Sequence, residues 1–176
     1  GGMIAQTMAI ERSKRVLSLT SIMSSTGTRE VIDIPDDCLE LLLAPAPTER
    51  DEYLDYSAKY SIWCSKKYFD RDLAREYAAV AYDRSHYPEG SGRQIAALLA
   101  SGDREPSLAS LDVPTLVIHG SDDRLILPHQ GERTAEVIPG AEYLLVNDMG
   151  HDLPQALWPE VVDSIHSHLR EATLAI

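Results

Sequence analysis

Two apolar segments, each ending in a turn that carries an acid or a histidine, decide the fold of this chain. Residues 114–128 read PTLVIHGSDDRLILP, and residues 141–154 read AEYLLVNDMGHDLP. The apolar run before each turn predicts a buried strand, and residues 128–137 between them predict a helix. Because the carboxyl ends of parallel strands meet at one edge of a sheet, we expect the two turns to lie side by side.

Asp123 and His151, one in each turn, form a candidate acid–base pair. An aspartate that hydrogen-bonds one ring nitrogen of a histidine fixes its tautomer, so that the other nitrogen can take a proton from a hydroxyl. Their separation of 28 positions is enough for one helix and one strand. Asp122 is the alternative acid in the same turn. The other interpretation of the pair is a turn-forming aspartate and a surface histidine.

The remaining loop carboxylates and serines give no second site of this kind. Asp148 and Asp152 flank His151, where they either tune its charge or serve as ordinary loop carboxylates. Ser91 stands between two glycines but lacks the preceding strand that a nucleophile elbow requires. We therefore expect no nucleophile within this chain.

The other histidines show no pattern typical of a metal or cofactor site. His86, His119 and His129 have no partner at a useful spacing. His166 and His168 are two positions apart on a predicted helix and therefore face different ways. The sequence contains no cluster of metal ligands and no phosphate-binding loop, so we expect neither a metal nor a cofactor.

The order of strands and helices predicts an α/β fold. The predicted strands cover residues 16–23, 115–119 and 142–146. Because helices separate them along the chain, they are expected to pair in parallel with right-handed crossovers. The fold class is then three parallel strands with flanking helices and a helical insertion. The predicted organisation is core over residues 1–27, helical insertion over residues 28–110, and core over residues 111–176.

Helices are predicted from capping residues and from the spacing of apolar residues. Residues 1–10 are apolar almost all round, which predicts a buried helix. In the insertion, Thr48 and Asp70 are predicted N-caps, and a short helix over residues 93–101 follows a loop over residues 85–92. An aromatic stripe on one helix face, more typical of a core than of a pocket, comprises Tyr53, Tyr56, Tyr60 and Trp63. Further buried stripes are predicted to comprise Leu73, Tyr77 and Val80, and, in the C-terminal helix, Val162, Ile165 and Leu169.

The composition of the chain argues against several classes of partner. Of 176 residues, 28 are acidic and 16 basic, which gives a net charge of −12 and argues against nucleic acid and anionic membranes. No apolar run approaches the roughly 18 residues needed to span a bilayer, and no secretory signal is recognisable. Cys38 and Cys64 lack a metal-binding spacing and are expected to be reduced thiols. A cytoplasmic location is the resulting expectation.

These motifs resemble those of the α/β-hydrolase family, and the resemblance covers most of the chain. VPTLVIHGSDDRLILP resembles the acid strand and turn, with Asp123 at the acid's position, and NDMGHDLP resembles the histidine loop, with His151 at the catalytic position. RQIAALLASGDR resembles a stretch of cap-bearing, esterase-like members. In this family the elbow G-x-S-x-G is commonly followed by a second glycine and an apolar helix, and this chain begins GGMIAQ.

The resemblance implies that the chain is the C-terminal part of a serine hydrolase. Its three strands would be the last three of eight, residues 28–110 would form a cap, and the nucleophilic serine would lie two positions before Gly1. The chain alone would then be inactive. The cut edge of its sheet would pair with the missing N-terminal half or with another copy.

Two hypotheses about function follow. The first is hydrolysis of small-molecule carboxylic esters, with Asp123 as the acid, His151 as the base and no cofactor. The second is a non-catalytic fragment or subunit that associates through its exposed sheet edge. Within the enzyme class, the family frame also carries lactonase, perhydrolase, C–C hydrolase and dehalogenase chemistry, because fold does not fix function.

Overall fold

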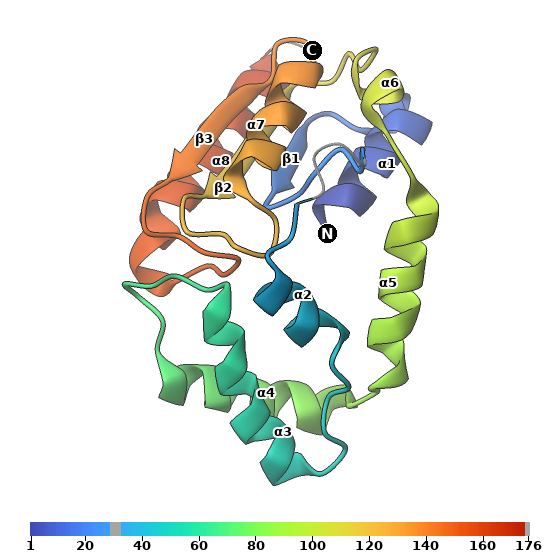
Figure 1. Cartoon of the computed structure of the whole chain (residues 1–176). Helices are drawn as coiled ribbons and strands as arrows, with labels where there is room; N and C mark the ends of the chain where they lie inside the picture. Colours follow the sequence, from blue (N-terminus) through green and yellow to red (C-terminus); the bar gives the residue numbers. More distant parts are fainter. Residues whose placement is uncertain (29–32, 175–176) are drawn as a thin grey trace.

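A three-stranded parallel sheet lies at the centre of the core in the computed structural model, which describes residues 1–28 and 33–174 (Figure 1). The strands are β1 (Leu19–Ile22), β2 (Thr115–Gly120) and β3 (Glu142–Val146), in the order β1-β2-β3. All six residues of β2 are buried, as expected of a central strand covered on both faces. The parallel sheet and its flanking helices confirm the predicted fold class.

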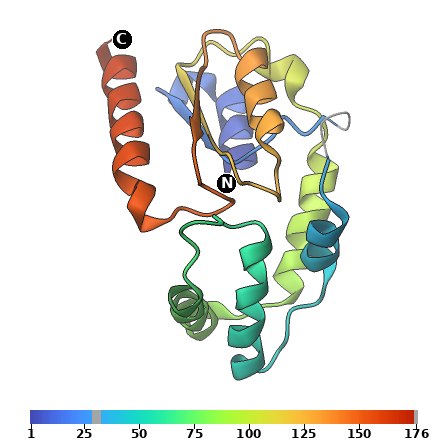
Figure 2. The ribbon, with the colours of Figure 1, turned by 60° about the vertical axis from the view of Figure 1, so that its left-hand side comes forward.

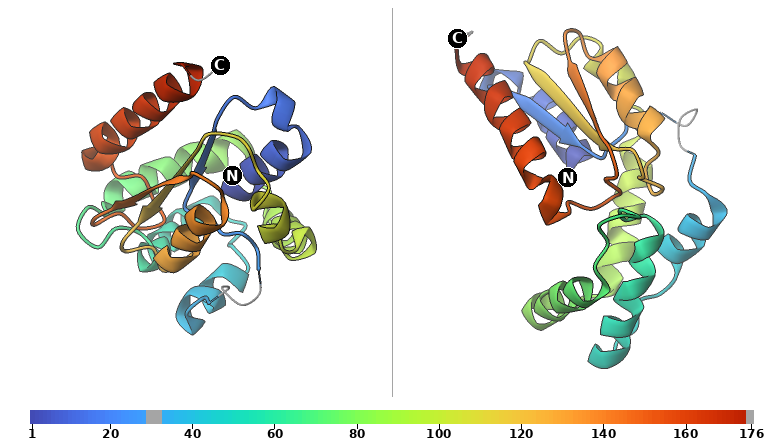
Figure 3. Two further views of the ribbon diagram at one scale, coloured as in Figure 1. Left: turned by 90° about the horizontal axis from the view of Figure 1, so that it is seen from above. Right: turned by 90° about the vertical axis from the view of Figure 1, so that its left-hand side faces the viewer.

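Helices cover both faces of the sheet. α1 (Gly2–Glu11) and α7 (Pro128–Val137) lie on one face, and α8 (Trp158–Leu174) lies on the other (Figures 2 and 3). Short 3₁₀ turns are η1 (Ser13–Arg15) and η4 (Gln155–Leu157). No helix within the described ranges is long and apolar enough to cross a membrane.

Most of the chain between β1 and β2 is helical. It forms α2 (Asp36–Leu43), α3 (Arg50–Ser57), η3 (Ala58–Ile62), α4 (Arg71–Ser85), α5 (Glu89–Ser101) and α6 (Glu105–Leu108). The carboxyl ends of the three strands point towards α2, α3 and α4 (Figure 1). The loops that follow the strands therefore lie between the sheet and this helical block.

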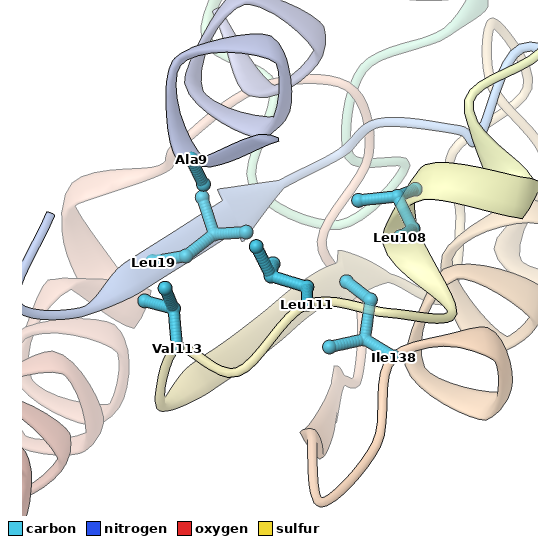
Figure 4. Close-up of a cluster of buried hydrophobic side chains, with 6 residues drawn as sticks. All are labelled: Ala9, Leu19, Leu108, Leu111, Val113 and Ile138. Carbon is cyan, nitrogen blue, oxygen red and sulfur yellow. The ribbon is translucent and has the colours of Figure 1, made fainter. Parts of the chain in front are cut away.

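Two apolar clusters, one on each face of the sheet, form the core. The cluster on the α1 side comprises Ala9, Leu19, Leu108, Leu111, Val113 and Ile138 (Figure 4). The cluster on the α8 side comprises Leu116, Ile118, Val146, Met149, Leu157 and Val161. Burial of each large side chain stabilises the fold by about 1.5–3 kcal/mol. The first cluster includes Leu108 of α6, so the chain is already packed against the core before β2 begins.

The prediction of a buried N-terminal helix is wrong. In α1 only Gln6 and Ala9 are buried, while the Ile4 and Met8 side chains are 67% and 58% exposed. The helix packs on β1 by one face, where Gln6 Nε2 donates a hydrogen bond of 3.0 Å to the Ser21 hydroxyl. Its high apolar content predicted burial all round, yet only one side meets other described residues.

The predicted buried stripes of α4 and α8 are wrong except at Leu73 and Ile165, which are partly buried. Exposed residues include Tyr77 and Val80 in α4 and Val162 and Leu169 in α8. In α8 the buried residues are Val161, His168 and Ala172, with Ile165 partly buried. These positions still follow helical spacing, so the periodicity was correct and the orientation of the helix about its axis was not.

Several predicted boundaries shift by a few residues. β1 begins at Leu19 and not at residue 16, because its pairing with β2 starts opposite Thr115. The N-cap of α3 is Glu49 and not Thr48. α5 begins at Glu89, inside the segment expected to be a loop. The predicted cap at Asp70 is confirmed, since its side chain accepts from the backbone amides of the next turn.

Candidate active site

Asp123 lies in the turn that follows β2, and this turn fixes its carboxylate. The residue is 1% exposed. Its Oδ1 accepts hydrogen bonds of 2.9 Å from the backbone N–H groups of both Leu125 and Ile126. Short-range side-chain to backbone bonds of this kind are typical of aspartates in turns. They leave Oδ2 directed at the histidine loop.

His151 lies in the loop that follows β3, beside Asp123. Its Nδ1 is 2.8 Å from Asp123 Oδ2, so Nδ1 carries the proton that the carboxylate accepts. Within residues 1–28 and 33–174, no hydrogen-bond partner occupies Nε2 of this ring, and the side chain is 27% exposed. The structure thus brings the two predicted site residues together in the arrangement that a catalytic acid and base require.

Direct backbone contacts hold the two turns side by side. The N–H of Asp122 donates to the carbonyl of Met149 at 2.8 Å, and the N–H of Ser121 donates to that of Val146 at 3.0 Å. Gly120 lies so close to Met149 that a Cβ atom on it would clash with the Met149 carbonyl. A glycine at the end of β2 is therefore required for the close approach of the acid and histidine loops.

Two other carboxylates near the pair are bonded to the segment that follows η3. Asp122 Oδ2 accepts from the backbone N–H of Lys66 at 3.3 Å. Asp148 forms an ion pair of 2.6 Å with Lys67. Asp122, the alternative acid, is thus bonded to the helical block and not to His151.

Asp152 joins the histidine loop to the segment that follows η3. Its Oδ1 accepts from the backbone N–H groups of Ser65 at 2.9 Å and Gly150 at 3.1 Å. Burial raises the pKa of Asp152, and these hydrogen bonds together with His151 only partly offset that effect. The carboxylate therefore bridges two segments that are far apart in sequence.

Residues 63–68 form a docking segment for both loops, which the sequence did not predict. The N–H of His151 donates to the carbonyl of Trp63 at 2.6 Å. Gly150 lies against the backbone of Cys64 and Ser65, where a Cβ atom would clash. Contacts between residues more than 80 positions apart produce no recognisable pattern in the local sequence. Gly150, directly before the histidine, is the one sequence signal that another segment packs closely against this loop.

His119 has a partner, contrary to the prediction. Its side chain is fully buried, and its Nε2 lies 2.7 Å from the Ile126 carbonyl and 3.3 Å from Asp123 Oδ2. Burial would raise the pKa of Asp123, but hydrogen bonds from His119 and His151 outweigh it, and the pKa lies below its ordinary value. The acid is therefore held ionised between two histidines.

Neither the cysteines nor Ser91 offers His151 a nucleophile. Cys38 and Cys64 are free thiols, as expected. Burial, with the nearby Asp152 and Asp123 carboxylates, raises the pKa of Cys64 to about 12, so its reactive thiolate is scarce at neutral pH. Ser91 lies on an exposed stretch of α5, away from any strand. In the part of the chain that the structure describes, no group of three His, Cys, Asp or Glu side chains is arranged to hold a metal.

The predicted aromatic stripe divides into two clusters. Tyr53 contacts the rings of Tyr82 and His86, and those two rings are stacked at 4.3 Å. His86 thus packs among aromatic rings, and its buried Nε2 has no hydrogen-bond partner among the described residues. Tyr60 is stacked on Trp63 at 5.3 Å. Tyr56 meets Tyr60 edge-on at 5.8 Å, so the division falls between Tyr53 and Tyr56, both within α3.

The class of protein that this fold and site define is confirmed by comparison with known sequences. The model of the alpha/beta hydrolase fold family matches residues 1–154. The chain belongs to the α/β-hydrolase fold family.

Relatives of known sequence include esterases and a lipase. Rhodomycin D methylesterase DnrP from Streptomyces peucetius is 24% identical over 195 aligned positions, which cover 99% of this chain and 65% of that protein. Lipase 3 from Moraxella sp. (strain TA144) is 39% identical over 49 residues, or 28% of this chain and 16% of that protein.

Solved structures share the fold. A thermophilic esterase from Thermogutta terrifontis matches with a TM-score of 0.70 and 24% identity, covering 97% of this chain and 62% of that one. The meta-cleavage product hydrolase from Pseudomonas fluorescens IP01 matches with a TM-score of 0.70 and 20% identity. The match covers 99% of this chain and 62% of that one. The chain spans less than two thirds of the length of each of these relatives.

Proposed function

We propose that this chain supplies the acid and the base of a serine hydrolase that acts on carboxylic esters. The observation that carries the proposal is the 2.8 Å contact between His151 Nδ1 and Asp123 Oδ2. It orients the ring so that Nε2 can act on a nucleophile. The nucleophilic serine lies outside residues 1–176, in keeping with the fact that the chain spans about 60–65% of its full-length relatives.

In the reaction, His151 Nε2 takes the proton of the serine hydroxyl while the serine oxygen attacks the ester carbonyl carbon. The resulting imidazolium is stabilised by the Asp123 carboxylate. It then gives its proton to the alcohol that leaves as the tetrahedral intermediate collapses to an acyl-enzyme. Water, deprotonated by the same nitrogen, attacks the acyl-enzyme, and collapse of that intermediate releases the acid and restores the serine.

The helical block over residues 28–110 acts as a cap in this proposal. Its docking segment contacts the acid and histidine loops directly, through Trp63, Ser65 and Lys66. A cap in this position bounds the space above Nε2 of His151 and so shapes the pocket for the acyl or alcohol group. The relatives matched by sequence, two methylesterases and a lipase, favour an ester over the other chemistries of the family.

Labelling with a fluorophosphonate, which forms a covalent bond with activated serines, tests the proposal. The enzyme in which this chain is joined to its nucleophile segment should be labelled on a serine outside residues 1–176, and should hydrolyse p-nitrophenyl butyrate. The chain of residues 1–176 alone should remain unlabelled. Labelling of any serine within the chain would contradict the assignment of the nucleophile.

A second candidate function is association without catalysis. β1 pairs with β2 alone among the described strands, so its other edge presents unpaired backbone groups. In this alternative the chain pairs through that edge with another polypeptide or with a second copy. Light scattering after size-exclusion chromatography separates the cases, because a stable monomer of the chain alone would argue against a pairing edge.

A further inference from the structure

We propose that His119 is a positioning residue, which holds the Asp123 carboxylate in the orientation that faces His151. The inference rests on the proposed function, because it takes Asp123 as the acid and His151 as the base. His119 does not approach the reacting atoms in this scheme. It acts through the carboxylate alone.

The residues packed around His119 prevent its ring from rotating. The residue lies in β2 and is fully buried. On one side its ring meets Gly131 of α7, where a Cβ atom would clash with Nδ1. On the other side Nε2 reaches the turn that carries Asp123. A glycine in the second turn of α7 is unfavourable for a helix by roughly 1 kcal/mol, and here it makes room for the ring.

The neighbours of the ring determine its tautomer. The Ile126 carbonyl, 2.7 Å from Nε2, can only accept a hydrogen bond. Nε2 therefore carries the proton, and this nitrogen also lies 3.3 Å from Asp123 Oδ2. Nδ1 has no partner among the described residues, and a second proton placed there would lack an acceptor. The geometry thus favours a neutral ring that donates from Nε2.

The donors around Asp123 show what His119 contributes. Oδ1 accepts from two backbone N–H groups, and Oδ2 accepts from His151 and lies within reach of His119. Without His119, the backbone N–H groups would still hold Oδ1, but Oδ2 would have His151 as its only neighbouring side-chain donor among the described residues. Asp123 also interacts electrostatically with Cys38, Cys64 and Asp152. None of the three donates a hydrogen bond to Asp123.

Two substitutions of His119 separate a donor role from a packing role. In His119→Leu the ring is replaced by an apolar side chain that fills space but cannot donate. In His119→Gln the amide N–H group can still donate to both acceptors. We expect the pKa of Asp123, read from its ¹³C carboxyl resonance in the chain of residues 1–176, to rise by roughly one unit in His119→Leu. In His119→Gln it should stay near the wild-type value.

Equal shifts in the two variants, or no shift in His119→Leu, would overturn the proposal. If His119→Leu does not fold, the ¹⁵N resonances of His119 in the wild-type chain provide the test. We expect Nε2 to be protonated and Nδ1 to be unprotonated at pH 7. Any other protonation state would overturn the proposal. These spectra need no enzyme activity. The proposed function fails instead if His151 is dispensable for ester hydrolysis, so the two failures are distinguishable.

Discussion

Asp123 and Asp152 both interact electrostatically with His151, and their surroundings shift their pKa values in opposite directions. Burial raises the pKa of both carboxyls. For Asp123 the hydrogen bonds from His119 and His151 outweigh burial, whereas Asp152 has only two backbone donors and its pKa remains raised. Asp123 is therefore strongly held as a carboxylate, and Asp152 tolerates a neutral form.

The Asp123→Asn variant should be less stable than the wild type at pH 7, by about 1–3 kcal/mol, because buried bonds to a charged group are lost. The folded pKa of Asp123 lies below the ordinary 3.8, so its stabilising effect is complete above that value and is lost as the pH falls through the folded value. Urea unfolding should thus show a difference at pH 7 that shrinks below pH 3.8. A difference that does not depend on pH would contradict this account.

The Asp152→Asn variant should behave in the opposite way. The folded pKa of Asp152 is above 3.8, so ionisation destabilises the fold as the pH rises through the raised value. An asparagine keeps the acceptor for Ser65 and Gly150 without the charge. In the same unfolding series, the free energy of unfolding of this variant should equal that of the wild type at pH 3 and exceed it at pH 7. Equal stability at both pH values would show that the charge has no cost.

At the residue scale, the sequence revealed the pair but not its supports. Asp123 and His151 were predictable because each directly follows an apolar strand and a glycine-containing turn. His119 was missed, because a histidine within a strand pattern looks like an ordinary strand-end residue. Gly131 in the helix opposite was an available signal of a buried ring, but its meaning depends on the rotation of that helix, which the sequence does not specify.

Among the elements, two were predicted to the residue. β3 and α7 match their predicted ranges, since Pro128 begins the helix and the Pro139-Gly140 pair follows it. The orientations of α4 and α8 were wrong. A helix face is set by what packs on it, and neighbouring apolar residues such as Val161 and Val162 are equally good candidates until the contacts are known.

Contact between the histidine loop and the docking segment can be tested with glycine substitutions. In Gly150→Ala the new Cβ would meet the backbone of Cys64 and Ser65, so the loop must move and carry His151 with it. Gly92→Ala in α5 is a matched control, because nothing lies within 4 Å of its Cβ position. Thermal unfolding should show a large loss of stability for Gly150→Ala. For Gly92→Ala it should show a gain in the free energy of unfolding of roughly 0.5–1 kcal/mol.

The two glycine variants should also differ in chemistry. Ester hydrolysis by the enzyme that contains this chain should fall at least 10²-fold in Gly150→Ala, because a displacement of about 1 Å at a catalytic group has this effect. Gly92→Ala should leave hydrolysis unchanged. Normal activity in Gly150→Ala would mean that docking of residues 63–68 does not position His151.

For the whole molecule, stability depends on core clusters that join distant parts of the chain. Leu108 is fully buried in the cluster that also holds Ala9 and Ile138, so Leu108→Ala should cost about 2–5 kcal/mol. Leu99→Ala is the control, because Leu99 is 69% exposed. Chemical denaturation of both variants measures the difference. Equal losses of unfolding free energy in the two variants would show that α6 does not pack on the core in solution.

The central claim is that His151 is the base of an ester hydrolase, and one kinetic comparison tests it most directly. The turnover of p-nitrophenyl butyrate should be measured for the enzyme containing this chain, for His151→Ala, and for His129→Ala as an exposed-histidine control. The account predicts a loss on the order of 10⁶-fold in kcat for His151→Ala and none for His129→Ala. Turnover in His151→Ala within tenfold of the wild type would contradict it.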